Sequence, residues 1–170
     1  MAMATSDEVM TTGAGRVVGL YVTAVAGAPM DAIDCAEAVA GQGLIGDRYQ
    51  AGCGTFSGRY AIGEGARALS LIDTADIARC GERLGRSIAP ADLRRNLAIA
   101  GLDLLVLRGR RLVIGDVVVR LIGRCAPCGY LSRLLQADMR AGLYRGGGVR
   151  AAIETGGALR LGDRVTVIGQ

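Results

Sequence analysis

Histidine and tryptophan are absent from this chain of 170 residues, and phenylalanine occurs only once. Without histidine, the chain cannot form a serine or cysteine catalytic site that relies on imidazole, or a zinc site with a histidine ligand. A zinc site of four thiolates is also disfavoured, because only two of the five cysteines have the spacing of a ligand pair. The scarcity of aromatic rings argues against binding of nucleic acid, although the formal net charge is +4. This charge is better suited to attracting a small anionic ligand.

Long apolar runs are missing too, and none approaches the roughly 20 residues that a membrane-spanning helix needs. The N-terminal region carries the polar run Thr5 to Glu8 in place of the basic and apolar segments of an export signal. Five cysteines are an odd number, without the density of a disulfide framework. The sequence therefore predicts a cytoplasmic protein that does not associate with membranes.

Apolar residues are plentiful, at 51% of the chain, which is enough for one compact domain. We expect a disordered leader over residues 1–14 and a single domain over 15–170. A helix is expected from Thr74 to about Leu84, capped by Asp73 and ended by Gly85. Strands are expected over 16–25, 35–39, 66–72, 97–100, 104–107, 111–114, 116–122, 149–153 and within 156–168. This order, without regular alternation of strands and helices, predicts a mainly β fold: a barrel or strongly bent sheet with a few covering helices.

The pair Cys125 and Cys128 follows the strand-like run and precedes leucines at helical spacing from Leu131 on. Such a strand-to-helix turn offers free backbone N–H groups and the positive end of a helix dipole, and both favour the thiolate. Arg124 adds positive charge, and Pro127 restricts the turn. We expect Cys128 to be the reactive thiol, with two packing cysteines as the alternative.

Two further segments are candidates for binding an anion. The glycine-rich run 41–59, which contains Asp47 and Arg48, is longer than most structureless loops, and such loops are usually functional or disordered. Arg94, Arg95 and Asn96 lie at the start of a strand, where two guanidiniums can bind phosphate or another oxyanion. The alternatives are a self-satisfied Asp-Arg pair and a solvated Arg-Arg pair.

The order of these motifs resembles the MOSC domain, the C-terminal module of molybdenum cofactor sulfurases, and most closely its stand-alone bacterial members. The likeness extends from about Val17 to Val167. It rests on the following segments: Gly43 to Tyr49, Arg94 to Asn96 with Gly101 to Leu104, Leu112 to Asp116, Arg124 to Cys128, Gly147 to Arg150, and Gly162 with Asp163.

This resemblance implies a barrel-like mixed sheet and a family cysteine at Cys128, which in relatives binds molybdenum or carries sulfur as a persulfide. It also implies that an anionic pterin, the molybdenum cofactor (molybdopterin), is bound by a set of polar residues. These are Asp47, Arg48, Arg94, Arg95, Asn96 and Arg124. Family members often have histidine near Asp47 and after the cysteine motif, where this chain has Tyr49 and Tyr130.

Three function classes are therefore open. The first is a molybdenum enzyme with Cys128 as metal ligand, which reduces N-hydroxylated compounds with electrons from a separate protein. The second is a sulfur carrier, loaded at Cys128 by a cysteine desulfurase that itself holds pyridoxal phosphate. The third is a thioredoxin-like dithiol module using Cys125 and Cys128, which suits the expected fold least. The sequence does not choose between the first two.

Overall fold

The computed structural model describes residues 13–58 and 65–169. The leader expected over residues 1–14 lies outside the described residues except for its last two positions, and Ala14 already belongs to the first strand. The elements of the described chain are β1 (Ala14–Val22), β2 (Asp31–Ala32), β3 (Cys35–Val39), β4 (Gly43–Leu44), β5 (Leu69–Asp73), α1 (Thr74–Leu84), the 3₁₀ helix η1 (Pro90–Leu93), β6 (Leu97–Ala100), β7 (Arg111–Ile114), β8 (Val117–Arg124), α2 (Gly129–Leu135), α3 (Met139–Gly142), β9 (Val149–Thr155), β10 (Gly157–Arg160) and β11 (Arg164–Ile168).

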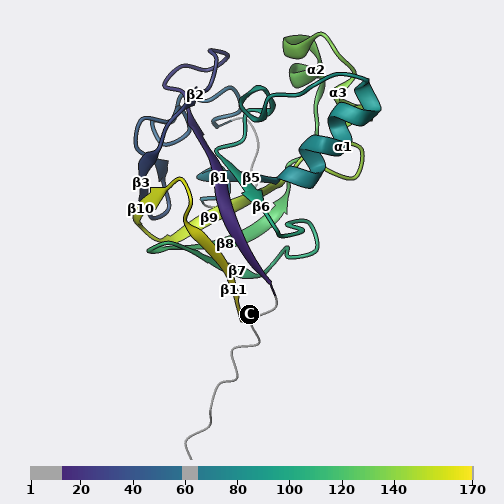
Figure 1. Ribbon diagram of the computed structural model, residues 1–170. Coiled ribbons are helices and arrows are strands. Elements are labelled where there is room, and N and C mark those ends of the chain that lie inside the picture. The colour runs from purple at the N-terminus through teal and green to yellow at the C-terminus, as the bar shows by residue number, and fades with distance from the viewer. Residues whose placement is uncertain (1–12, 59–64, 170) are drawn as a thin grey trace, which may run out of the picture.

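Seven strands close into a barrel in the order β11, β7, β8, β9, β5, β6 and β1 (Figure 1). Closure comes from antiparallel pairing of β1 with β11, in which Ala14 lies opposite Thr166. β5 and β6 are parallel, whereas the other pairs around the barrel are antiparallel. The small sheet β10, β3 and β4 lies beside it. This arrangement confirms the predicted mainly β, barrel-like mixed sheet with a few covering helices.

The barrel interior is filled by alternate residues of its strands. Along β8, Val117, Val119 and Leu121 are buried, and the residues between them are more exposed. The same alternation on β7 and β11 adds Leu112 and Val167 to one apolar cluster. Successive side chains of a strand point to opposite faces of the sheet, so every second residue of each barrel strand faces the interior.

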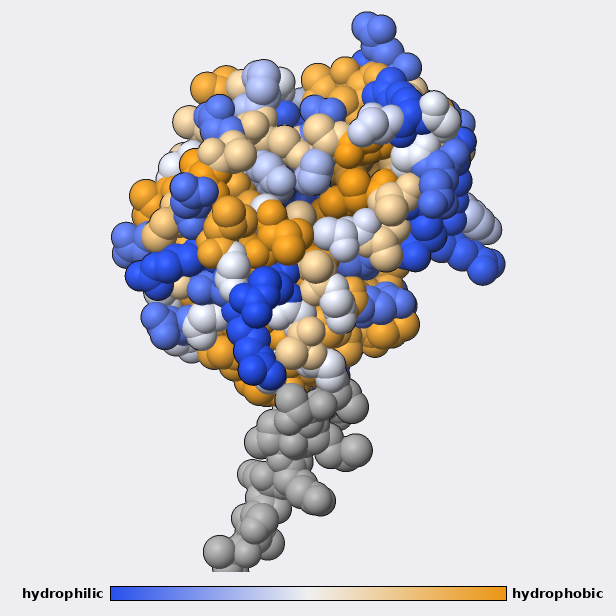
Figure 2. Space-filling view, in the orientation of Figure 1, coloured by the Kyte–Doolittle hydropathy of each residue, from blue (hydrophilic) through white to orange (hydrophobic). Residues whose placement is uncertain are grey.

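The helices cover one side of the barrel, at the upper right of Figure 1. α1 runs from Thr74 to Leu84 as predicted, with the carboxylate of Asp73 accepting the backbone N–H of Asp76 and Gly85 in the left-handed conformation. A second apolar cluster, which includes Ile72, Cys80, Leu131 and Met139, joins this helical layer to the sheet. Figure 2 shows hydrophilic residues gathered over the exposed face of α1.

One expected strand is absent from the described chain. The strand expected over 104–107 is a turn, because the Asp103 side chain accepts the backbone N–H groups of Leu105 and Val106 at 3.1 and 3.4 Å. The crossover from β5 through α1 to β6 makes these two strands parallel, whereas β7 and β8, which follow, form an antiparallel hairpin. The short strands β2 and β4, of two residues each, were not expected. No helix in the described ranges is long and apolar enough to cross a membrane.

Candidate functional site

The cysteine motif forms the connection between β8 and α2, as the sequence predicts. The Cys125 backbone N–H donates to the Gly148 carbonyl at 2.9 Å. Cys128 is the N-cap residue of α2 and has extended backbone angles, but its side chain makes no capping hydrogen bond. Both thiols are free; Cys125 is buried and Cys128 is partly exposed. The other three cysteines lie elsewhere, and burial raises the pKa of the Cys80 thiol.

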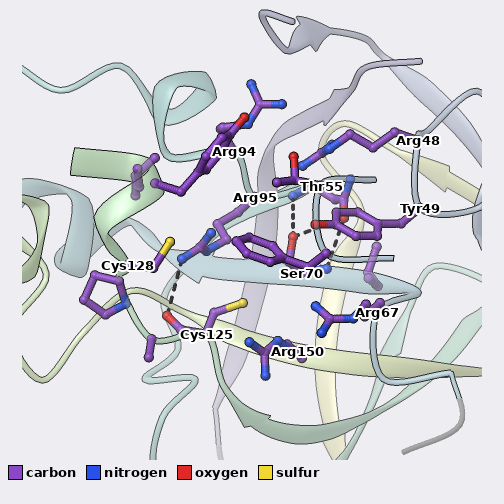
Figure 3. Close-up of a pocket in the computed structure, with 17 residues that line it drawn as sticks. Arg48, Tyr49, Thr55, Arg67, Ser70, Arg94, Arg95, Cys125, Cys128 and Arg150 are labelled. Atoms are coloured by element: carbon purple, nitrogen blue, oxygen red, sulfur yellow. Dashed lines mark hydrogen bonds between the residues drawn. The ribbon is translucent and has the colours of Figure 1, made fainter. Parts of the chain in front are cut away.

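Both thiols line a cavity of about 110 Å³ on the outer face of the barrel (Figure 3). Ser70 of β5 and Arg150 of β9 lie opposite each other in the sheet and both contribute to its wall. Their neighbours Leu71 and Ala151 face the barrel interior. None of the described lining residues carries a carboxylate. Five arginines line the cavity, namely Arg48, Arg67, Arg94, Arg95 and Arg150.

Arg48 is held by Asp47, which lies behind it and does not line the cavity. The buried carboxylate of Asp47 accepts from Arg48 Nη1 at 3.1 Å and from the backbone N–H of Tyr49, also at 3.1 Å. The Arg48 guanidinium lies 4.8 Å from the centre of the Tyr49 ring. Its Nε is buried and has no hydrogen-bond partner among the described residues. Asp47 thus neutralises and orients Arg48 from outside the cavity wall.

Arg94 also has an unused donor atom. It follows η1 with a positive φ of 61°, and its Nη1 donates to the Ala28 carbonyl at 2.6 Å. Its Nη2 is buried without a partner in the described chain. Burial, and secondarily the charge of Arg48, lower the pKa of the Arg94 guanidinium, but arginine stays protonated in proteins. Two arginines that line the cavity therefore each keep one buried nitrogen without a partner in the described chain.

Arg95, the next residue, donates through all three of its side-chain nitrogens to backbone carbonyls. Its Nε donates to the Gly147 carbonyl at 2.8 Å, its Nη1 to Leu93 at 3.2 Å and its Nη2 to Cys125 at 3.3 Å. The close approach of the loop before β9 needs glycine, because a Cβ on Gly147, at φ 96°, would lie 2.7 Å from the Cys125 carbonyl. Arg95 therefore fixes the cysteine turn against this loop.

The remaining predicted residues have structural contacts. Asn96 lines the cavity, but its Oδ1 accepts from the backbone and the hydroxyl of Ser70, and its Nδ2 donates to the Tyr21 carbonyl. Arg124 does not line the cavity and donates to the carbonyls of Gly146 and Leu143. The structure thus brings Arg48, Arg94, Arg95 and Asn96 together with both cysteines, and places Asp47 and Arg124 outside the wall.

Sequence analysis missed two of the cavity arginines. Arg150 ends one of the motifs quoted for the family resemblance, but no role was assigned to it. Arg67 lies in the strand expected over 66–72, which in the structure begins only at Leu69, and no role was assigned to it. Phe56 and Tyr130, whose rings meet edge to face at 6.0 Å, also contribute to the wall. These residues meet only because the sheet places β5 beside β9, which no short pattern encodes.

The profile of the MOSC domain matches residues 40–166, more than half of the chain and all the segments that form this cavity. The chain belongs to the MOSC domain family. This family is associated with the molybdenum cofactor. Membership removes the support for a thioredoxin-like dithiol module, since the two cysteines stand on a MOSC barrel.

Solved structures share this MOSC fold. The YuaD protein from Bacillus subtilis superposes with a TM-score of 0.78 at 21% identity, over 95% of this chain and 100% of that chain. YiiM from Escherichia coli gives 0.66 at 16% identity, over 91% of this chain and 70% of its own. YiiM from Geobacillus stearothermophilus gives 0.64 at 16% identity, over 91% and 75%. At these identities the likeness concerns the fold alone. A search of curated proteins finds no match.

Proposed function

We propose that this MOSC domain binds the molybdenum cofactor in the cavity, with Cys128 as the sulfur ligand of molybdenum or as the carrier of a sulfur atom. The observation that supports this most is that free thiols and incompletely paired guanidiniums line one cavity, with no carboxylate among the described lining residues. A thiolate is a soft ligand, and a guanidinium fork suits phosphate. The two halves of the cavity therefore match the two chemical parts of a metal-pterin phosphate.

The buried arginines fit the anionic part. Arg48 Nε and Arg94 Nη2 lack acceptors within the described chain, and a buried donor without a partner costs about 1–3 kcal/mol. A phosphate in the cavity would neutralise the charge of these guanidiniums. The cavity, at about 110 Å³, is smaller than the roughly 300–1,000 Å³ of sites that enclose a drug-sized ligand, so it would enclose only part of such a cofactor.

The cysteine turn fits the metal part. Cys128 is partly exposed at the cavity, whereas Cys125 is 8% exposed and its carbonyl is held by Arg95. Cys128 is therefore the more accessible of the two thiols. A bound cofactor would supply redox chemistry at molybdenum. In the enzyme form of the proposal this chemistry reduces N-hydroxylated compounds in the cytoplasm, with electrons from a separate protein. In the carrier form, a cysteine desulfurase loads Cys128.

Elemental and pterin analysis of protein purified from a cofactor-competent host tests the proposal. Wild type should contain molybdenum and pterin in near-equal amounts. Cys128→Ser should lose at least about tenfold in both, because serine offers no soft thiolate, while Cys125→Ser should lose less. Cys35→Ser, at an exposed position outside the cavity, is the matched control.

Full retention of molybdenum in Cys128→Ser would contradict a role for this thiol as ligand. Labile sulfur on Cys128 in wild-type protein without molybdenum would favour the carrier form. Protein that contains neither molybdenum nor labile sulfur would refute both.

A further inference from the structure

Two of the five cavity arginines make no side-chain hydrogen bond or ion pair that would account for their position, as far as the described residues go. Arg67 and Arg150 are partly exposed, and within the described chain neither makes a hydrogen bond or ion pair through its side chain. The Arg67 guanidinium lies 5.9 Å from the centre of the Phe56 ring. By contrast, the side chains of Arg48, Arg94 and Arg95 all donate to groups of the protein. Arg67 and Arg150 are thus free to bind a ligand.

The sheet register fixes where Arg150 points. It lies opposite Ser70 of β5 and opposite Gly123 of β8, and directly opposed residues share one face of a sheet. Gly123 leaves space beside it, because a Cβ at that position would meet nothing within 4 Å. Figure 3 shows Arg67, Arg150 and the sulfur of Cys125 on one side of the drawn residues, with Arg48 and Arg94 on the other. In this view Arg67 and Arg150 thus lie across the cavity from Arg48 and Arg94, with Arg95 between them.

The charges are also too many for one anionic group. Asp47 neutralises Arg48, but no described lining residue neutralises Arg67 or Arg150. Cations that converge in a cavity repel each other, so a bound anion is favoured. The planar guanidinium pairs best with carboxylate or phosphate, through two parallel hydrogen bonds.

We propose that Arg67 and Arg150 form a second oxyanion subsite beside the cavity thiols, which binds the anionic group of a small organic substrate. This inference rests on the proposed function, in which Arg48 and Arg94 hold the cofactor. The substrate bound at this second subsite is consequently an organic anion. A neutral compound of the same shape leaves the two cations unpaired and is a poor substrate.

Paired alkylating agents of nearly equal shape test the subsite on cofactor-free protein. Iodoacetate is anionic and iodoacetamide is neutral, and either thiolate displaces iodide from both. The measured quantity is the ratio of the iodoacetate rate to the iodoacetamide rate, read by peptide mass at Cys125, Cys128 and the exposed Cys35. We expect the ratio at the faster cavity thiol to exceed the ratio at Cys35 by at least about tenfold, the size of one charge-assisted hydrogen bond.

The double variant Arg67→Gln/Arg150→Gln should bring this ratio close to that of Cys35. Arg160→Gln removes one positive charge at an exposed position on β10 and should leave the ratio unchanged. In wild type, acetate and phosphate at constant ionic strength should slow iodoacetate at the cavity thiols, whereas acetamide should not. The more effective competitor shows whether the subsite prefers a carboxylate or a phosphate. This measurement uses wild-type protein alone, so it does not depend on the folding of a variant.

Equal ratios at the cavity thiols and Cys35, or a ratio that falls with Arg94→Gln and not with the double variant, would overturn the subsite. Loss of cofactor from the double variant as complete as from Arg94→Gln would also overturn it, because these arginines would then hold the cofactor, and the proposed function would stand. A high ratio that depends on Arg67 and Arg150 in a protein that never contains molybdenum, pterin or labile sulfur would refute the proposed function and leave the anion subsite.

Discussion

Neighbouring arginines in this chain have different roles because their hydrogen-bond partners differ. Arg95 donates through all three of its nitrogens to backbone carbonyls of three segments. Arg94 donates through Nη1 to one carbonyl and has a buried Nη2 with no partner in the described chain. We therefore regard Arg95 as a residue that positions the cysteine turn and Arg94 as a residue that binds a ligand.

Arg94→Gln and Arg95→Gln should accordingly separate affinity from stability. Arg94→Gln should weaken cofactor binding by more than about tenfold, since it removes a charged donor, with little change in Tm. Arg95→Gln should lower the free energy of unfolding by more than about 1.5 kcal/mol, because three carbonyls lose their donor. Thermal melts and cofactor content of the two variants check this. Equal effects of both changes on Tm would refute the assignment.

The junction of β5 and α1 illustrates how one residue can serve two elements. Asp73 ends the strand, and its side chain caps the helix by accepting the Asp76 backbone N–H at 2.8 Å. The same carboxylate is buried, and its burial, more than any neighbouring charge, raises the pKa of Asp73. Asp73 therefore caps α1, but its ionised carboxylate is partly removed from water.

The stability contribution of Asp73 should consequently increase in acid. A raised folded pKa means that the folded protein binds the proton more tightly. The resulting stabilisation is complete below the unfolded value of about 3.9 and is lost as the pH rises through the folded pKa. Asp73→Asn keeps a capping oxygen without the charge. Wild type should thus become more stable relative to Asp73→Asn as the pH falls from 7 to 3, measured by urea unfolding.

Asp73→Ala is the control for the cap itself and should cost about 1 kcal/mol over the whole pH range relative to Asp73→Asn. A difference between wild type and Asp73→Asn that stays constant, or decreases in acid, would show that burial does not disfavour this charge.

At the scale of the whole molecule, the barrel interior supports a site that lies on its outer face. The apolar cluster inside the barrel includes residues of β1, β6, β8 and β11, whereas the cavity arginines lie outside it. Packing and ligand binding are therefore separable, although both use the same strands.

Adjacent residues of β8 test this separation. Leu121 is fully buried inside the barrel and Ile122 is 39% exposed on the other face. Leu121→Ala should lower the free energy of unfolding by about 2–5 kcal/mol, and Ile122→Ala by less than about 1 kcal/mol. Folded Leu121→Ala should retain the iodoacetate preference of the cavity thiols. Similar losses of stability would mean that the two faces of β8 are equally packed, contrary to the structure.

Much of the element order follows from the sequence because its signals are local. Short apolar runs rich in β-branched residues predict β7 and β8, and Asp73 and Gly85 predict the bounds of α1. A strand followed by helical leucines predicts the turn that carries Cys125 and Cys128. Each depends on contacts between residues close in the chain. The turn over 104–107 was missed because Asp103 competes locally with strand formation.

The site itself was decided by the tertiary structure. The sequence supplies the thiols and the Arg-Arg pair, but it does not state that Arg95 holds three carbonyls or that Asp47 lies behind Arg48. Arg150 reaches the cavity because β9 pairs with β5 and β8, segments far apart in the chain. Strand pairing at such separations is set by which arrangement buries all the apolar faces together, so it depends on the whole sequence and cannot be read from any one segment.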